Sequence, residues 1–477
     1  MKPWKLLLFL TACLSAFLLL GFVFPDGIRI GSLELKFFRL PGDETGTGPA
    51  SENRIDKSAL LQLQKKAEIL AAEDTLISGG KQIQEDDASG ILGPDVEFHI
   101  DSASALQYPA GDSTILDAVF QRMDSARLRG ELVRILHIGD SQIEGDRISG
   151  YLRQRLQQRF GGCGPGLIPI SEELPSRLYL RMDGFEQTEK FQLLGSGKKG
   201  RHNSYSLLHH YFHLKPDSDG SARAEFRYRL NQQGYRRNAY FEQALLLSKN
   251  TDAKLSISSG LGNRRYLASD SLRFIGWKSN RPEKEFSLSI STGTGTDLLG
   301  LCLDCRSGVA LDNIPLRGSS GLELLKINPA FLQEQVRRLN TRLIILQFGV
   351  NVVPYEAPSY TWYENNLVKI ISLLKKSAPG IQVLVVGVSD MARKKNGNWG
   401  SFETIPAVIE AQRRACARTN AAFWDMYQVM GGKNAILAWS KTNPPLAGKD
   451  MIHLTPKGAQ VVGEFLYQAI QREIPSP

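Results

Sequence analysis

The spacing of hydrophobic residues changes along this chain and divides it into two kinds of structure. Between about 113 and 160, and again from about 322 onward, short apolar runs alternate with amphipathic stretches, which predicts buried parallel strands covered by helices. Between about 171 and 305, apolar and polar residues alternate one by one, which predicts half-buried antiparallel strands. We therefore expect an α/β fold, a flavodoxin-like doubly wound parallel sheet, with an antiparallel β-sandwich inserted after its first strand–helix unit.

The same spacing places the individual elements of the parallel part. Amphipathic stretches predict helices at 113–128, 147–160, 329–339, 361–378, 406–419 and 455–472. Apolar runs predict strands at 135–138, 343–348, 381–388 and 421–425. Thr361 followed by Glu364 has the spacing of a capping box, so Thr361 is expected to cap its helix.

The N-terminus carries a long, mostly apolar run after two lysines. Residues 6–24 have about the length needed to span a bilayer, and Lys2 and Lys5 precede them on the side expected to stay cytoplasmic. We expect residues 1–25 to be an uncleaved anchor that enters the inner membrane through residues 4–24 and leaves the catalytic part in the periplasm. The alternatives are a lipoprotein, because Leu10-Thr11-Ala12-Cys13 resembles a lipoprotein box, and a secreted form.

Composition then separates the remaining chain into segments. The stretches 43–58 and 74–95 are polar and glycine-rich, as linkers are, whereas 58–73 carries Leu and Ala at helical spacing. We expect a linker with one helix at 26–94, an α/β domain made of 95–170 and 306–477, and the inserted sandwich at 171–305. A length of 477 residues is too great for one ordinary core, which agrees with two folded parts.

The charge of the chain is basic but dispersed. The formal net charge is +9, and Lys and Arg occur throughout, without an aromatic-basic stripe or a zinc-finger spacing. This pattern predicts a solvated basic surface and no nucleic-acid partner. A basic surface also suits an anionic polymer of the cell envelope.

Cysteine and histidine patterns give no indication of a metal or a cofactor. The five cysteines are too few and too scattered for a disulfide framework, and the CxxC pair of Cys302 and Cys305 lacks a second pair. We expect both to be structural. His209, His210 and His213 form an HHxxH pattern, but no carboxylate is adjacent, so we expect no zinc site there.

A polar turn after the first predicted strand contains the most informative serine. Ser141 lies in the sequence Gly139-Asp140-Ser141, between the end of a strand and the start of a helix. An α/β fold exposes nucleophiles at this place, where backbone N–H groups also point at negative charge. Taken alone, such a pattern is more often a serine that only caps a helix.

A second polar block lies directly before the last predicted helix. Asp450 and His453 are spaced as DxxH. With this spacing the carboxylate can reach Nδ1 of the imidazole and leave Nε2 free as a base. The block therefore supplies the base and the orienting acid that a nucleophilic Ser141 requires.

Two further blocks end in groups that can donate hydrogen bonds. Asn351, in Gly349-Val350-Asn351, follows the strand at 343–348, so its side-chain amide is expected above the edge of the sheet. Gly318 closes the run 313–318 and places a backbone N–H at a neighbouring loop. Such donors can stabilise the negative charge that develops on a carbonyl oxygen during attack.

Along the chain the four blocks follow one another as Ser141, Gly318, Asn351 and the DxxH block of Asp450 and His453. In that chain order they resemble the blocks of the SGNH hydrolases, also called the GDSL esterase family. The resemblance covers roughly 95–170 and 306–473 and leaves out the sandwich. It implies an ester hydrolase without metal or cofactor. It also implies roles: Ser141 as nucleophile, His453 as base and then acid, Asp450 as orienting acid, and the N–H groups of Ser141, Gly318 and Asn351 as the oxyanion hole.

The chain departs from the family pattern at two positions. Gln142 replaces the usual Leu after the serine, and Val352 replaces the Asp that often follows Asn351. Neither change removes a catalytic atom, although the second alters the support of Asn351. Gly321 is an alternative to Gly318 as the second block's glycine.

The inserted sandwich narrows the expected substrate. An SGNH domain interrupted in this way resembles bacterial peptidoglycan O-acetylesterases, whose insertion resembles a carbohydrate-binding module. The resemblance implies removal of O-acetyl groups from a cell-envelope polysaccharide, most simply peptidoglycan. Two alternatives stay open: an O-acyltransferase that modifies an envelope glycan together with a membrane acyltransferase partner, and a non-catalytic glycan-binding envelope protein.

Overall fold

The structure, a computed structural model, describes most of the chain after residue 104. The described residues are 28–30, 33–35, 105–109 and 112–474, apart from gaps at 173–176, 178, 185–187, 196, 201, 216–219, 232–233, 251–254, 267–268 and 293–295. The predicted membrane anchor at 1–25 and the predicted helix at 58–73 lie outside these residues. Within the described ranges, no helix combines the length and the apolar character needed to cross a membrane.

The chain divides into two compact units, residues 1–54 and 55–477. The first contains a short antiparallel hairpin of β1 (Ile28–Ile30) and β2 (Leu33–Leu35). This hairpin falls in the stretch 26–94, for which the sequence predicts a linker. The second unit holds all the predicted site residues.

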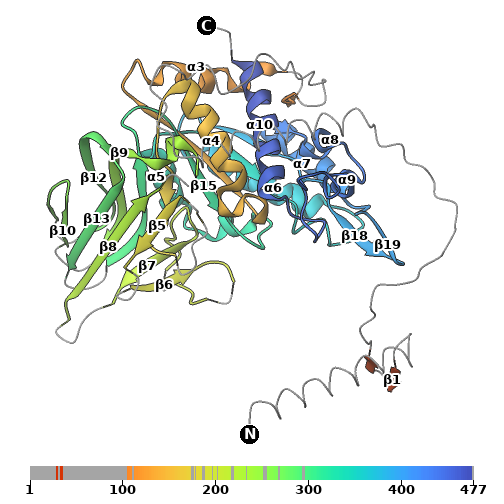
Figure 1. The fold of residues 1–477 in the computed structure, drawn as a ribbon, viewed down its shortest axis with the longest axis horizontal. Helices are drawn as coiled ribbons and strands as arrows, with labels where there is room; N and C mark the ends of the chain where they lie inside the picture. Colours follow the sequence, from red (N-terminus) through yellow and green to blue (C-terminus); the bar gives the residue numbers. More distant parts are fainter. Residues whose placement is uncertain are drawn as a thin grey trace. The chain divides into compact units, whose positions relative to one another are not determined.

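A five-stranded parallel sheet forms the centre of the second unit (Figure 1). Its strands lie in the order β15-β3-β16-β17-β20, and every neighbouring pair is parallel. Numbered along the chain, this is the order 2-1-3-4-5, the predicted flavodoxin-like arrangement. The strands are β3 (Leu132–Gly139), β15 (Gly308–Pro315), β16 (Thr341–Gln347), β17 (Gln382–Val386) and β20 (Ala422–Trp424).

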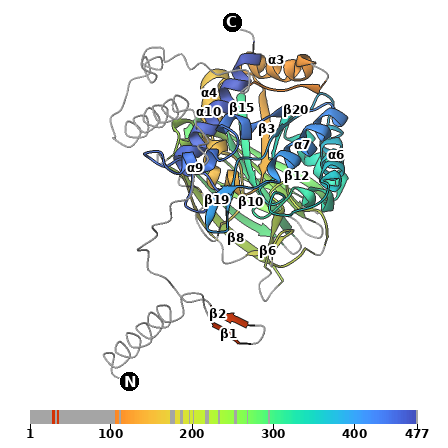
Figure 2. The same cartoon turned by 90° about the vertical axis from the view of Figure 1, so that its right-hand side faces the viewer.

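Helices cover both faces of this sheet because its strands are apolar on both sides (Figure 2). In β16, Leu343 and Ile345 share a core with one set of helices, whereas Ile344 and Leu346 share a core with the other. The first set is α3 (Asp117–Ala126), α4 (Arg147–Phe160) and α10 (Pro456–Glu473). The second set is α5 (Pro329–Arg338), α6 (Thr361–Lys375) and α7 (Ile405–Thr419).

Short elements complete the α/β part. They are the 3-10 helices η3 (Ser113–Leu116), η4 (Ser141–Asp146) and η6 (Leu322–Lys326), the helices α8 (Met426–Met430) and α9 (Ala435–Trp439), and the hairpin of β18 (Ala392–Lys395) and β19 (Asn398–Ser401). The predicted helix at 113–128 is thus η3 continued by α3.

One predicted helix start is wrong. Thr361 is the first residue of α6 rather than its cap, and the preceding Tyr360 makes no side-chain capping bond. Glu364 instead accepts hydrogen bonds from Arg414 and Arg418 of α7. These charge-assisted bonds hold the Glu364 carboxylate against α7, away from the N-terminus of its own helix.

The antiparallel strands between α4 and β15 form two sheets that share one core. Phe226 and Leu288 of one sheet and Leu246 and Trp277 of the other are buried together in it, which makes a β-sandwich. One sheet has the order β11-β10-β13-β8-β5, and the other has the order β12-β9-β14-β7-β6 with β4 added beside β14. The strands are β4 (Gly166–Ile168), β5 (Leu180–Asp183), β6 (Thr188–Gln192), β7 (His210–Leu214), β8 (Ala222–Leu230), β9 (Phe241–Asn250), β10 (Leu255–Ser259), β11 (Arg264–Tyr266), β12 (Ser269–Glu283), β13 (Glu285–Thr292) and β14 (Thr296–Asp304), with the 3-10 helix η5 (Arg236–Ala239).

Two links fasten the ends of the insertion beside the parallel sheet. A disulfide joins Cys163, after α4, to Cys305, just before β15. In addition, the buried Arg134 of β3 donates hydrogen bonds to the buried carboxylates of Asp304 and Asp312. The two carboxylates compensate the buried guanidinium charge, so the exit of the sandwich is tied to the first strand of the sheet.

The disulfide distinguishes the two cysteines of the CxxC pair, both of which were expected to be structural. Cys302 is a buried free thiol in β14, whereas Cys305 belongs to the disulfide, so the CxxC pair is not itself bonded. The partner of Cys305 is 142 residues away. Sequence spacing could not show this pairing, because it depends on how the insertion returns to the sheet.

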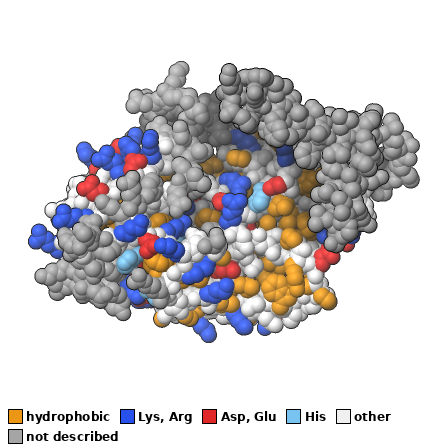
Figure 3. Space-filling view, turned by 90° about the horizontal axis from the view of Figure 1, so that it is seen from below, with side chains coloured by type: hydrophobic (Ala, Val, Ile, Leu, Met, Phe, Trp, Pro, Cys, Tyr) orange, Lys and Arg blue, Asp and Glu red, His pale blue; other side chains and the backbone are white. Residues whose placement is uncertain are grey.

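Lys and Arg side chains are dispersed over the surface. Figure 3 shows them scattered across one face of the molecule, with acidic and hydrophobic side chains between them. This distribution agrees with the solvated basic surface that the sequence predicts.

Candidate active site

The turn that carries Ser141 begins where β3 ends against β16. A Cβ at Gly139 would lie 2.6 Å from the carbonyl oxygen of Gln347, so glycine is needed where the two strands approach. Asp140 then caps η4, its side chain accepting the backbone N–H of Gln142. Ser141 is therefore held in the first turn of η4, at the carboxyl end of β3.

Ser141, His453 and Asp450 form a continuous chain of hydrogen bonds. Ser141 Oγ lies 2.7 Å from His453 Nε2, and His453 Nδ1 lies 2.7 Å from Asp450 Oδ2. Because an ionised carboxylate can only accept, Nδ1 carries the proton and Nε2 accepts the hydrogen bond from the Ser141 hydroxyl. This is the geometry of a serine activated by an oriented base.

The charged form of Asp450 is stabilised by its own loop. Partial burial raises the pKa of this carboxyl, but hydrogen bonds from the His453 ring and from the backbone N–H groups of His453 and Ile452 outweigh it, and the pKa is lowered overall. The N–H of Gly448 binds the His453 carbonyl at 2.7 Å. One short loop therefore orients both the acid and the base.

Ser141 faces a cavity of about 410 Å³ that also contains the predicted oxyanion donors. Its lining residues are Ser141, Glu144, Arg147, Arg317, Gly318, Asn351 and His453. Gly318 follows β15 and has a φ of 77°, a conformation that favours glycine. The alternative, Gly321, donates its N–H to Ser319 Oγ at 2.8 Å and is not among the lining residues.

Asn351 lies in the sharp turn after β16. One side-chain N–H donates to the carbonyl of Ser319 at 2.8 Å, which leaves the second for a ligand in the cavity. The turn requires Gly349, whose φ is 140° and where a Cβ would lie 2.6 Å from Val388 Cβ. Val352 is buried and donates its N–H to the Gly349 carbonyl. The Ser319 carbonyl thus orients Asn351 beside the buried Val352.

Asp140 connects the turn of Ser141 to the turn of Asn351. Its Oδ2 accepts the backbone N–H of Val350 at 3.2 Å, directly before Asn351. Burial raises the pKa of Asp140 to about 6, against the opposite effect of the hydrogen bonds from Gln142 and Val350. Asp450 accepts the hydrogen bond from His453 Nδ1, whereas Asp140 bonds the backbone of the two turns, so Asp140 supports these turns and is not placed as the triad acid.

Three charged residues at the cavity were not predicted from the sequence. Arg147 donates to the carbonyl oxygens of Ser141 and Leu454, at 2.6 and 3.0 Å, and so joins the two loops of the triad. Arg317 and Glu144 form an ion pair at 3.7 Å. Their only sequence signal was proximity, because Glu144 and Arg147 follow the serine closely and Arg317 precedes an expected oxyanion glycine.

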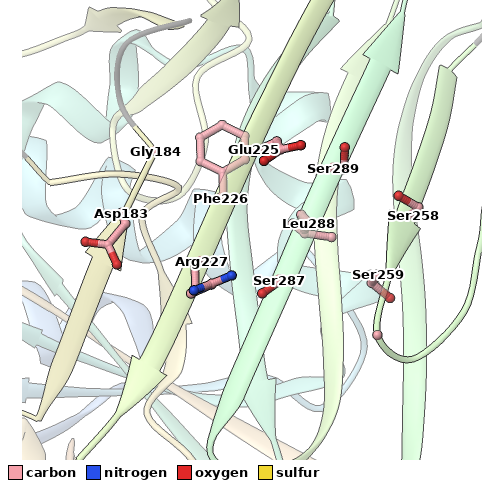
Figure 4. A pocket seen from close by; sticks show the side chains of 11 residues that line it. Asp183, Gly184, Glu225, Phe226, Arg227, Ser258, Ser259, Ser287, Leu288 and Ser289 are labelled. Carbon is pink, nitrogen blue, oxygen red and sulfur yellow. The ribbon is translucent and has the colours of Figure 1, made fainter.

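A second hollow, of about 540 Å³, lies on the sandwich and contains none of the predicted site residues (Figure 4). Its lining residues are Asp183, Gly184, Glu225, Phe226, Arg227, Ser258, Ser259, Gly260, Ser287, Leu288 and Ser289. Glu225 and Arg227 of β8 pair in register with Ser289 and Ser287 of β13, which makes the hollow polar. With no histidine among its lining residues, it offers no base for a serine.

Two histidines of the sandwich, His202 and His213, lie against the same carboxylate, that of Asp297. In the described part of the chain, no group of three or more His, Cys, Asp or Glu side chains could hold a metal ion. His209 is buried, and burial lowers its pKa to about 3. His213 Nδ1 lies 2.7 Å from Asp297 Oδ1, so this imidazole has a carboxylate partner.

Comparison with known proteins agrees with the geometry of the cavity. Residues 279–461 match the model of the GDSL-like lipase/acylhydrolase family. This chain carries a GDSL-like lipase/acylhydrolase domain. The domain is that of a carboxylic ester hydrolase, the enzyme class that the sequence motifs predict.

The segment matched by the GDSL-like model begins 138 residues after Ser141 (279 minus 141). It contains Gly318, Asn351, Asp450 and His453. The insertion separates the nucleophile block from the rest of the domain in sequence. In the structure Ser141 nevertheless lines the same cavity as Gly318, Asn351 and His453.

One solved structure shows the same fold over most of this chain. A peptidoglycan O-acetylesterase is 19% identical and covers 77% of this chain and 99% of its own, with a TM-score of 0.62. An acetyl xylan esterase is 20% identical over 34% of this chain and 81% of its own, with a TM-score of 0.27. A family two carbohydrate esterase from Cellvibrio japonicus is 8% identical and covers 62% of this chain and 98% of its own, with a TM-score of 0.26. No curated protein matches the sequence.

Proposed function

We propose that this protein is a serine esterase that removes O-acetyl groups from a cell-envelope polysaccharide, with peptidoglycan as the first candidate. The observation that carries the proposal is the hydrogen-bonded chain of Ser141, His453 and Asp450, which opens into one cavity with Gly318 and Asn351. A nucleophile, a base, an orienting acid and two further donors are the groups that ester cleavage requires.

The proposed reaction has two steps. Ser141 Oγ attacks the acetyl carbonyl while His453 Nε2 takes the hydroxyl proton, and the negative charge on the carbonyl oxygen is met by the N–H groups of Ser141, Gly318 and Asn351. His453 then gives the proton to the departing sugar oxygen, which leaves an acetyl group on Ser141. Water, deprotonated by His453, attacks this acetyl ester; the bond between the acetyl carbon and Ser141 Oγ breaks, His453 returns the proton to Ser141 Oγ, and acetate leaves.

The substrate part of the proposal rests on the overall architecture. The similarity to the peptidoglycan O-acetylesterase extends over 77% of this chain, more than the parallel domain alone would account for. The polar hollow on the sandwich adds a surface with hydroxyl, carboxylate and guanidinium groups, which suit a sugar chain. We propose that the sandwich holds the polysaccharide near the cavity.

The esterase proposal is tested by acetate release from O-acetylated peptidoglycan and from p-nitrophenyl acetate. Ser141→Ala should lower kcat on both by at least about 10⁴-fold, because the nucleophile is lost. Ser291→Ala, which changes an exposed serine of the sandwich outside the hollow, is the matched control and should leave hydrolysis of both substrates unchanged. Activity that survives in Ser141→Ala would exclude Ser141 as the nucleophile.

The same assay separates hydrolysis from transfer. The acetyl group on Ser141 can pass to water or to a sugar hydroxyl, and the triad serves both acceptors. We expect acetate as the product in the presence of unacetylated glycan. Accumulation of acetylated glycan with little acetate would favour the acyltransferase alternative.

We also propose that the folded part lies outside the cytoplasm, held by residues 1–25 at the inner membrane. The Cys163–Cys305 disulfide supports an oxidising compartment, because glutathione keeps cytoplasmic thiols reduced. Fractionation should find the full chain in the membrane, with its catalytic part sensitive to protease added from the periplasmic side. Recovery of a soluble periplasmic form that lacks residues 1–25 would contradict the anchor.

A further inference from the structure

Gln142, the residue directly after the nucleophile, is buried and reaches across to the loop that carries the base. Only 1% of Gln142 is exposed. Its Nε2 donates to the backbone carbonyl of Ile452 at 2.7 Å, and its Oε1 accepts the backbone N–H of Leu454 at 3.4 Å. The two partners lie immediately before and after His453. Both ends of one side chain therefore hold the peptide groups that flank the base.

These contacts complete the set of bonds around the His453 backbone. The His453 N–H donates to Asp450 Oδ1 at 3.1 Å, and the His453 carbonyl accepts from Gly448 at 2.7 Å. Both bonds are internal to the loop, so they shape it without placing it relative to Ser141. Gln142 belongs to the nucleophile turn, so its bonds, together with those of Arg147 to the Ser141 and Leu454 carbonyls, set the position of the loop relative to Ser141.

We infer that Gln142 is a positioning residue: it fixes the His453 imidazole relative to Ser141 by holding the peptide groups on either side of it. The inference rests on the proposed esterase function. It also gives a physical reason for the departure from the family pattern, since Leu could fill the same space but could bond neither Ile452 nor Leu454. Catalytic groups must be held within roughly 0.5 Å of their productive geometry.

The inference predicts which part of the reaction depends on Gln142. His453 first removes the Ser141 proton and then protonates the leaving oxygen as the carbon–oxygen bond of the ester breaks. An alkoxide is a poor leaving group and needs that proton, whereas p-nitrophenolate leaves without it. A displaced imidazole should therefore impair esters of alcohols more than esters of p-nitrophenol.

The test compares p-nitrobenzyl acetate with p-nitrophenyl acetate, two esters that share the acetyl group and differ in the leaving oxygen. In Gln142→Leu and in Gln142→Met we expect kcat to fall about 30-fold or more on the benzyl ester and about 5-fold or less on the phenyl ester, with KM nearly unchanged. Gln157→Leu is the matched control. Gln157 is also a buried glutamine that bonds backbone carbonyls, those of Gly164 and Val309, but these lie away from the cavity.

The control separates positioning from stability. Gln157→Leu should lower Tm without changing the ratio of the two kcat values, whereas the Gln142 variants should change that ratio. Equal losses on both esters, or unchanged kcat in the Gln142 variants, would overturn the inference. Leu and Met both fill the buried site, so either folded variant suffices.

A covalent probe keeps this result distinct from failure of the proposed function. A fluorophosphonate labels a serine that a histidine activates, whatever ester the enzyme prefers. If the wild-type protein releases acetate from neither model ester and not from O-acetylated peptidoglycan, the proposed function fails, and the labelling rate of Ser141 still decides the inference. We expect labelling to be at least about 5-fold slower in Gln142→Leu than in the wild type and in Gln157→Leu. Equal labelling rates would contradict the positioning role.

Discussion

Ser141 Oγ and His453 Nε2 lie 2.7 Å apart although 312 positions separate the two residues in the sequence. The complete sandwich intervenes between them. The contact forms because β3 and the loop before α10 end on the same edge of one parallel sheet, where such folds place their ligands. The disulfide and the Arg134 ion pairs hold the returning chain beside β3.

Replacing Asp450 by Asn should remove the correct tautomer of His453. The amide can donate to Nδ1 and thereby favour a proton on Nε2, which then cannot accept the proton of Ser141. We expect kcat for p-nitrophenyl acetate at neutral pH to fall about 10³- to 10⁴-fold, with little change in KM. Asp124→Asn, at an exposed position of α3, is the control. A loss below tenfold would mean that Asp450 does not orient the base.

Removing the side-chain amide of Asn351 should weaken binding of the oxyanion. Its free N–H is in place for charge that develops only during attack, so Asn351→Ala should lower kcat about 10²- to 10³-fold and leave KM nearly constant. The measurement is steady-state hydrolysis of p-nitrophenyl acetate, with Asn398→Ala in the β19 hairpin as control. A change confined to KM would show that Asn351 binds the substrate rather than the transition state.

Stability should depend on pH through Asp140. The pKa of this buried carboxyl is raised to about 6 in the folded protein, above its ordinary value of 3.8. The folded state therefore binds more protons than the unfolded state between these values, so the contribution of Asp140 falls as pH rises from about 4 to 6. A difference of about two pKa units corresponds to about 3 kcal/mol at most.

Urea unfolding of the wild type and of Asp140→Asn at pH 4, 5, 6 and 7 measures this contribution. The variant has a side chain of similar size without an ionisable group at position 140, so the pH dependence that Asp140 contributes is absent from it. The free energy of unfolding of the wild type minus that of the variant should decrease as pH rises to about 6 and then stay level. A difference that is constant with pH would contradict the raised pKa.

Loss of the Cys163–Cys305 disulfide should lower stability without altering the chemistry. The bond closes a loop that includes the entire sandwich, and removal of such a bond typically costs about 2–5 kcal/mol. We expect a lower Tm for the Cys163→Ala, Cys305→Ala double variant and unchanged kcat at low temperature, since neither cysteine lines the cavity. A reductant should lower the Tm of the wild type but not of the double variant. Equal Tm values for the two proteins would show that the disulfide contributes nothing.

Much of the fold follows from local patterns. The predicted helix at 147–160 coincides with α4, and the apolar runs at 343–348 and 381–388 become neighbouring parallel strands. The repeat of hydrophobic residues in a helix or a strand depends on which side chains that element buries, so it can be recognised in a short stretch of sequence. The prediction of a capping box at Thr361 was wrong because Glu364 bonds Arg414 and Arg418 of another helix. No local sequence pattern indicates these contacts.

The sequence by itself predicted the chemistry of the site. Each block indicates its role through a few neighbouring residues: a serine at a strand end, a carboxylate three positions before a histidine, and an amide after the central strand. The structure places the serine, the histidine and the amide at one cavity, with the carboxylate bonded to the histidine, and their catalytic roles stay a prediction until the variants are measured.

The tertiary structure alone decided what holds those blocks in place. Three sets of contacts join segments that are far apart in sequence. They are the disulfide of Cys163 with Cys305, the buried hydrogen bonds of Arg134 to Asp304 and Asp312, and the hydrogen bonds of Gln142 on both sides of His453. The physical reason is that a hydrogen bond or a disulfide depends on atoms meeting in space. The spacing of hydrophobic residues indicates whether one stretch forms a helix or a strand. Where a long insertion returns to the sheet depends on how the whole chain packs.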